Sequence, residues 1–159
     1  MRTIRSFVRR AGRLTAPQQG ALVELWPIYG IELKEELLDL DEIFGRRAER
    51  VLDIGFGNGD ALIFSTQENP EQDFIGIEVH KPGMGHCLLM ARASGISNLR
   101  LIQHDAVEVL QNQIPNGAIK RINLLFPDPW PKKRHHKRRL LQEPFVNLAG
   151  KKLRSGGTF

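Results

Sequence analysis

The chain alternates between short apolar runs and longer segments in which apolar residues have helical spacing. The apolar runs are typical of buried strands, and they begin near residues 51, 74, 99, 121 and 157. The first four occupy 50–55, 73–79, 98–105 and 119–126, and helical patterns follow at 60–69, 81–95, 106–114 and 143–153. This alternation predicts right-handed βαβ units, and hence an α/β fold with a mostly parallel sheet and helices on both faces.

Two further regions lie outside this alternation. A short helix is expected within 17–30 and is predicted to break at Pro27, while the Ser-Gly-Gly sequence at 155–157 is predicted to turn into the fifth strand. Residues 1–16 are expected to form a flexible basic arm. A length of 159 residues suits one hydrophobic core, so we expect a single domain over 17–159 behind that arm.

Open parallel sheets bind ligands outside the carboxyl ends of their strands. Four segments rich in polar residues or glycine fall at these ends in the predicted sheet. They are residues 53–59, 78–80, 104–105 and 127–130. We therefore expect them to meet at one edge of the sheet.

The glycine-rich sequence "LDIGFGNGD" follows the first predicted strand. Gly55, Gly57 and Gly59 allow a tight turn and close approach of the backbone to a ligand. The dinucleotide fingerprint has glycine or alanine where this chain has Asp60, and that carboxylate would face a pyrophosphate at the helix start. Together with Asp53, it favours a nucleoside ligand that carries positive charge and no phosphate. S-adenosylmethionine has these properties.

Acidic residues also end the second and third predicted strands. Glu78 can accept hydrogen bonds from both hydroxyls of a ribose, and Asp105 can accept one from an adenine amino group. Each residue has an alternative interpretation. Asp105 is also placed to cap the helix at 106–114, and Glu78 can be a solvated loop residue.

Positive charge is concentrated in two segments of a chain whose net charge is +5. Five arginines precede the first acidic residue, Glu24, and residues 132–139 are all Lys, Arg or His. Such segments indicate a polyanionic partner, although a solvated surface is the alternative. The single cysteine, Cys87, lies in an apolar helical run, which suits a small core residue in a reducing compartment. We expect neither a membrane span nor a secretory signal.

Several of these motifs together resemble the bacterial tRNA (guanine-N7-)-methyltransferases. The similarity extends over "LDIGFGNGD", "EQDFIGIEVHKPG", "SNLRLIQHDAVEVL" and "FPDPWPKKRHHKRR", and "IRSFVRRAGRLT" resembles the basic arm of that family. The resemblance implies a cytoplasmic enzyme with a Rossmann-like methyltransferase fold. It also implies S-adenosylmethionine as the methyl donor and N7 of a guanosine in the tRNA variable loop as the acceptor.

The resemblance also assigns roles to individual residues. It implies cofactor contacts for Asp53, Glu78, Asp105 and Asp128, beside the loop glycines Gly55 and Gly57. Asp128 is implied as the catalytic residue. Contacts with tRNA are implied for Lys132, Arg134, His135, His136, Lys137, Arg138 and Arg139. The two histidines suit phosphate neighbours better than metal ligands, and no metal site is predicted.

Members of the family continue beyond the position of Phe159 with a helix and two more strands. We therefore expect the last strands of the sheet to be missing from this chain. Two other functions stay open at this point: a non-catalytic RNA-binding remnant and an NAD-dependent oxidoreductase. The sequence does not distinguish a monomer from a homodimer.

The chemistry of the acceptor suggests what Asp128 does. Guanine N7 has a lone pair and no proton, so it needs no general base before it attacks a methyl group. We expect Asp128 to accept hydrogen bonds from guanine N1–H and the 2-amino group and so to hold N7 in line. Pro127 and Pro129 restrict the backbone on either side. Trp130 is expected either to stack on a base or the cofactor rim, or to pack beneath the loop.

Overall fold

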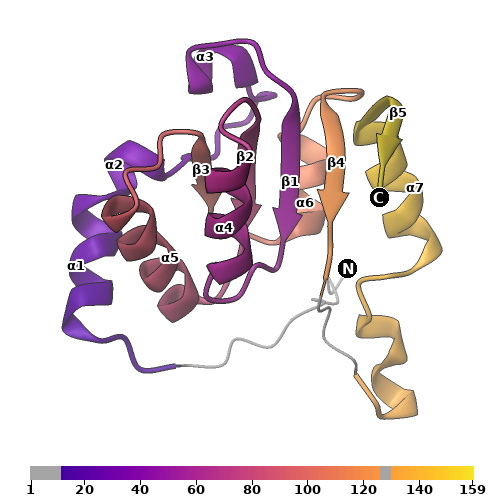
Figure 1. The fold of residues 1–159 in the computed structure, drawn as a ribbon. Helices are drawn as coiled ribbons and strands as arrows, with labels where there is room; N and C mark the ends of the chain where they lie inside the picture. The colour runs from indigo at the N-terminus through magenta and orange to yellow at the C-terminus, as the bar shows by residue number, and fades with distance from the viewer. Residues whose placement is uncertain (1–11, 126–129) are drawn as a thin grey trace.

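Five parallel strands form one sheet in the order β3-β2-β1-β4-β5 (Figure 1). A computed structural model describes residues 12–125 and 130–159. The strands are β1 (Arg50–Ile54), β2 (Asp73–Ile77), β3 (Leu99–Ile102), β4 (Ile119–Asn123) and β5 (Leu153–Thr158). The chain first builds outward from β1 to β3 and then crosses back to β4. The carboxyl ends of β1 and β4 therefore flank the switch point at which ligands of such sheets bind.

Helices cover both faces of the sheet. They are α1 (Ala16–Glu24), α2 (Trp26–Tyr29), α3 (Leu40–Phe44), α4 (Asp60–Glu68), α5 (Lys81–Ala93), α6 (Ala106–Asn112) and α7 (Glu143–Lys152), with the 3₁₀-helix η1 (Lys133–Arg138) before α7. One apolar core joins α1, α4 and α5 to the sheet, and a second joins α3, α6 and α7 to the opposite face. In Figure 1, α4 lies in front of the sheet and α6 behind it.

The two cores explain why the strands read as continuous apolar runs. Successive side chains of a strand point to opposite faces, so Val51 enters the first core and its neighbour Leu52 enters the second. All five residues of β1 and all five of β2 are buried. A strand covered on both faces has no polar alternation, which is the pattern of a central parallel strand. The predicted α/β fold class is confirmed.

The predicted strand near residue 157 begins earlier, because α7 leads directly into β5 at Leu153. The Ser-Gly-Gly sequence is part of this strand and not a turn. The register of β5 against β4 is irregular, since Ile119 pairs with Leu153 but Arg121 pairs with Thr158. Gly156 has φ +76° within the irregular stretch. Glycine here supports a bulge, which has the same sequence signal as a turn.

The beginning of the described chain also differs from the prediction. Thr15 caps α1, so the helix begins at Ala16, inside the range predicted for the arm. The break within 17–30 falls at Leu25, and Pro27 instead occupies the first turn of α2. Proline is tolerated there because the first amides of a helix have no intrahelical acceptor. The rest of the predicted arm, residues 1–11, lies outside the described residues. Among the described helices none is long and apolar enough to cross a membrane.

The amino ends of the strands are held by an ion pair between the buried carboxylate of Asp73 and the partly exposed Arg46. Asp73 is completely buried, and its Oδ1 accepts hydrogen bonds from Arg46 Nε at 2.9 Å and Nη2 at 2.6 Å. Arg50 lies beside them and forms an ion pair with Asp41 at 2.7 Å. Charges that are buried need partners of this kind. This cluster lies at the opposite end of β1 and β2 from the glycine loop, so it supports the sheet and leaves the carboxyl edge to other residues.

Candidate functional site

The glycine loop connects the carboxyl end of β1 to the start of α4. Gly55, Gly57 and Gly59 have φ angles of +69°, +63° and +87°, in the left-handed region that other residues rarely adopt. A Cβ atom on Gly55 or Gly57 would meet no described atom within 4 Å. These two glycines are therefore required by the backbone conformation, and the space beside them is open to a ligand.

The other side of the loop lies directly on α5. A Cβ on Gly83, in the first turn of α5, would lie 2.1 Å from the carbonyl oxygen of Gly57. A Cβ on Gly59 would lie 2.6 Å from Cys87 Sγ. His80 caps the helix because its Nδ1 accepts a hydrogen bond from the Gly83 amide at 3.3 Å. Neither contact was predicted from the sequence, which placed His80 only at the carboxyl edge and Gly83 only within a helical pattern.

Glu78 connects the end of β2 to the glycine loop. Its Oε2 accepts a hydrogen bond from the Gly57 amide at 2.9 Å. Its Oε1 accepts from the amides of Val79 at 2.8 Å and His80 at 3.0 Å. These hydrogen bonds argue against a freely solvated side chain, although Glu78 is only half-buried. Three backbone amides fix its carboxylate at the edge where a ligand is expected.

Asp105 follows β3 and caps α6, as its alternative interpretation predicted. Its Oδ1 accepts hydrogen bonds from the amides of Val107 at 2.8 Å and Glu108 at 3.4 Å. No described group donates a hydrogen bond to its Oδ2. Capping therefore orients the side chain and leaves one oxygen available, so both predicted roles are compatible with this geometry.

Asp53 is a buried carboxyl group at the switch point of the sheet. It is 7% exposed and lies in register with Asn123 on β4. Burial raises the pKa of Asp53 to about 6, against the opposing effects of a hydrogen bond with Asn123 and the charge of Arg121. Burial and the neighbouring Asp53 and Asp60 also raise the pKa of the Cys87 thiol to about 12. Cys87 is thus an unreactive core residue, as its sequence context predicted.

The segment that carries Asp128 continues from this point. The strand β4 ends at Asn123, earlier than the predicted end at residue 126. Leu124 and Leu125 are described, but Asp128 lies outside the described residues. Because Asn123 is the neighbour of Asp53, the segment leaves the sheet at the switch point. The role of Asp128 stays a prediction.

The basic segment after the proline-rich turn forms η1, and none of its six residues is buried. Its side chains differ in what they contact. The ring of His135 stands edge-on to Trp130 at 5.5 Å, and the Arg138 guanidinium lies 5.2 Å from the centre of the same ring. His136 Nε2 lies 3.4 Å from the carbonyl oxygen of Pro131. This arrangement favours packing over base stacking as the role of Trp130.

The predicted phosphate contacts of the segment therefore do not form one uniform set. Lys132, Arg134, Lys137 and Arg139 are exposed. Burial and the charges of Arg138, Arg134 and Lys132 lower the pKa of His135. Because its ring is also packed against Trp130, His135 is a poorer partner for phosphate than the exposed cations. The composition of the segment does not predict which of its residues contact Trp130 and which are exposed, because this depends on their spacing along η1.

The parallel sheet and its helices match the Rossmann-like fold of solved methyltransferases. A solved antibiotic-related methyltransferase has a TM-score of 0.57 at 18% identity, over 78% of this chain and 61% of that one. The antibiotic-resistance methyltransferase Kmr has a TM-score of 0.56 at 21% identity, over 80% of this chain and 64% of that one. At these identities the likeness establishes the fold alone.

Similarity to curated sequences identifies the family. A family model described as "Putative methyltransferase" matches residues 47–159. The tRNA (guanine-N(7)-)-methyltransferase of Nitrosococcus oceani is 54% identical over 99% of this chain and 67% of its own length. That of Escherichia coli is 53% identical over 100% of this chain and 66% of its own. The chain belongs to the tRNA (guanine-N7-)-methyltransferase family and spans about two thirds of the length of these relatives.

The contact between Gly83 and Gly57 predicts a large effect of a small substitution. Gly83→Ala should lower the free energy of unfolding by about 3 kcal/mol, because the obstructing atom is a backbone carbonyl that cannot rotate away. Urea denaturation measures the change. Gly150→Ala in α7 is the matched control, since its Cβ would meet no described atom within 4 Å. That variant should gain about 0.5–1 kcal/mol. Equal effects of the two substitutions would contradict this packing.

The raised pKa of Asp53 predicts a pH dependence of stability. Between pH 3.8 and about 6 the folded chain keeps a proton on Asp53 that the unfolded chain has released, so stability falls as pH rises through this window. The shift corresponds to about 3 kcal/mol. Asn cannot titrate, so the stability of Asp53→Asn relative to the unsubstituted chain should rise by most of that amount, about 2.4 kcal/mol, between pH 4 and pH 7. Urea denaturation at each pH tests this, and a constant difference would exclude a buried acid.

Proposed function

We propose that this chain binds S-adenosylmethionine at the glycine loop and takes part in methylating N7 of a guanosine in the variable loop of tRNA. The observation that carries the proposal is the convergence of Asp53, Glu78 and the open side of the glycine loop at the switch point of the sheet. Membership of the family supports the reaction, because the curated relatives bear the name of that enzyme.

The chemistry of the site fits this cofactor. Ionised carboxylates only accept hydrogen bonds, and Asp53, Glu78 and Asp105 lie at or just beyond the carboxyl ends of three neighbouring strands. S-adenosylmethionine offers them a sulfonium, an ammonium, two ribose hydroxyls and an adenine amino group. A pyrophosphate would instead meet the carboxylate of Asp60 at the start of α4. The site therefore favours S-adenosylmethionine over NAD, and the oxidoreductase interpretation is not supported.

Each acid has a distinct role in this proposal. Glu78 is held by three amides and accepts hydrogen bonds from the ribose hydroxyls, which needs only the remaining lone pairs of its oxygens. Asp105 accepts from the adenine amino group with Oδ2. Asp53 faces the positive end of the ligand, whose charge favours its ionised form. When bound, S-adenosylmethionine supplies a methyl group on a positively charged sulfur.

Asp128 positions the acceptor base. Guanine N7 loses no proton on methylation, so a carboxylate at this point has no proton to remove and does not act as a general base. It accepts from N1–H and the 2-amino group and offsets the positive charge that develops on the purine. The predicted position suits this role, because the segment after Asn123 leaves the sheet beside Asp53. The family resemblance of the Pro-Asp-Pro-Trp turn is the remaining support.

The basic segments bind the RNA. The exposed cations of residues 132–139 and the arginines of the arm contact phosphates, and this binding weakens as salt rises. Selectivity for tRNA comes from the shape of the RNA and from an accessible, flipped base. The partner and the single buried cysteine suit the cytoplasm.

A methylation assay on unmodified tRNA tests the proposal. Two proteins are compared: this chain and a chimera that continues it with the C-terminal third of the Nitrosococcus oceani relative. We expect 7-methylguanosine in the variable loop from the chimera. Asp128→Ala in the chimera should reduce turnover at least about 100-fold, because the base is no longer oriented, and change the Kd for S-adenosylmethionine less than about threefold.

The outcomes separate the parts of the proposal. A chimera that binds tRNA and S-adenosylmethionine but transfers no methyl group to N7 would contradict the assigned reaction. Equal losses of turnover and cofactor affinity in Asp128→Ala would contradict the positioning role alone. Phe64→Ala is a suitable control, since it removes an exposed aromatic ring of α4 that has no role in the proposal.

A further inference from the structure

Trp130 has a backbone conformation that requires support from its surroundings. Its φ of +40° is the only positive value outside glycine among the described residues. The left-handed region is unfavourable for a bulky residue, and the residue before a proline, here Pro131, prefers extended backbone. Such a conformation persists only where neighbouring contacts hold it. The described contacts of Trp130 include a hydrogen bond that Arg139 Nη2 donates to its carbonyl oxygen at 3.5 Å, and two contacts of its ring.

His135 and Arg138 hold the Trp130 ring, one edge-on at 5.5 Å and the other by a cation–π contact at 5.2 Å. They are three residues apart in η1, which has hydrogen bonds from His135 N to Lys132 O and from Arg139 N to His136 O. Residues three apart lie on the same side of a 3₁₀-helix. No residue of η1 is buried, and its other described contacts include the hydrogen bonds that Gln142 Nε2 donates to the carbonyl oxygens of His136 and Arg139. Trp130 supplies the only described aromatic support of this helix.

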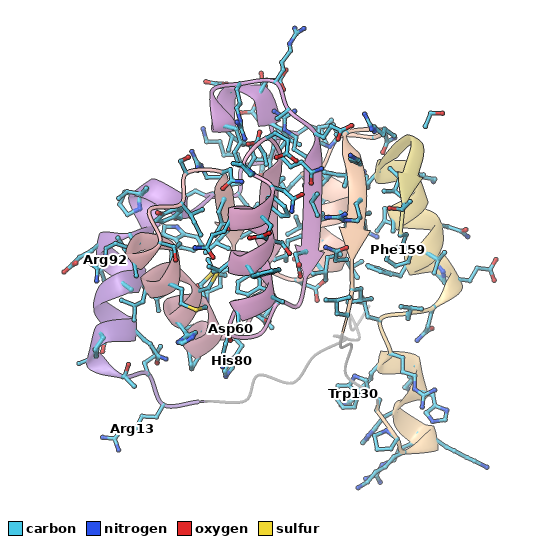
Figure 2. All side chains as sticks on the ribbon, in the orientation of Figure 1. Arg13, Asp60, His80, Arg92, Trp130 and Phe159 are labelled. Carbon is cyan, nitrogen blue, oxygen red and sulfur yellow. The ribbon has the colours of Figure 1, made fainter. Side chains whose placement is uncertain are left out.

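The same spacing places other cations away from Trp130. Arg134 and Lys137 are also three apart, and both are exposed. They therefore form a second row of η1, with a rise of about 6 Å between them. That separation suits successive phosphates of one nucleic-acid strand. Figure 2 shows Trp130 beside η1, which projects from the end of the molecule that also carries Asp60 and His80.

We propose that Trp130 is a positioning residue, which orients η1 so that Arg134 and Lys137 face the phosphates of the RNA beside the methylation site. This inference rests on the proposed function for the identity of the polyanion. The competing role is direct stacking of the Trp130 ring on a base of the RNA, instead of packing against His135 and Arg138. The two roles differ in their salt dependence, because stacking releases no counterions whereas phosphate contacts do.

The first test measures tRNA affinity of the chain as a function of salt. Trp130→Ala should weaken binding about tenfold near 0.1 M salt and reduce the slope of log K against log salt by about 1.5, the contribution of two phosphate contacts. The double variant Arg134→Ala/Lys137→Ala should show a similar reduction. Trp130→Phe retains a ring for His135 and Arg138 and should keep most of the slope. Weaker binding of Trp130→Ala with an unchanged slope would overturn positioning in favour of base stacking.

The second test needs no RNA. Trypsin cuts after Lys and Arg, so cleavage within 132–139, followed by mass spectrometry, reports how well η1 is ordered. Trp130→Ala should increase that cleavage about fivefold, while Trp130→Phe and the control Phe64→Ala should change it little. Unchanged cleavage in Trp130→Ala would overturn the proposal. If the unsubstituted chain does not bind tRNA, the proposed partner fails, and proteolysis still decides whether Trp130 orders η1.

Discussion

The hydrogen bond between the Gly57 amide and the Glu78 carboxylate is the interaction on which the candidate site depends. It joins the loop after β1 to the end of β2 at 2.9 Å. Two more amides hold the same carboxylate, so the loop is tied to a side chain that cannot move independently. The close approach of Gly57 to Gly83 fixes the loop from the other side. A glycine loop held in this way keeps its ligand-facing side open before any ligand arrives.

The order of the strands determines which chemistry gathers beside this loop. Because β4 lies next to β1, Asn123 is brought beside Asp53 although they are far apart in the sequence. Asp53 and Cys87 are both buried, and burial raises the pKa of the Asp53 carboxyl group to about 6. A positively charged ligand at this position would offset the cost of burying the ionised carboxylate. That cost falls at the candidate site, while the two apolar cores stabilise the fold.

Much of this arrangement could be predicted from the sequence. Central strands such as β1 and β2 are buried on both faces, so their apolar runs were unambiguous, and the glycines of the loop marked the turn that follows. The acids at the strand ends could be placed at one edge because parallel strands share their polarity. For Asp105 the sequence left two roles open, and the geometry accommodates both.

Other features could not be read from local patterns. The glycines at 156–157 are typical of a turn, but they belong to β5, which pairs with β4 in an irregular register. The basic segment contains only Lys, Arg and His, so its composition does not distinguish one residue from another. Its 3₁₀ geometry does, because it places His135 and Arg138 against Trp130. The short helix α3 has five residues, too few for a periodic pattern. The charge state of Asp53 depends on tertiary burial, which neighbouring residues do not encode.

The central claim is that the glycine loop and the acids beside it form a binding site for S-adenosylmethionine. Titration calorimetry of this chain with S-adenosylmethionine and, separately, with NAD tests this claim most directly. The carboxylates at the strand ends should bind S-adenosylmethionine at least about tenfold more tightly than NAD, because only the former brings positive charge without phosphate. Glu78→Gln should weaken that binding, since the amide cannot serve three backbone donors and a ribose equally well. Tighter binding of NAD, or binding of S-adenosylmethionine that is indifferent to Glu78, would contradict it.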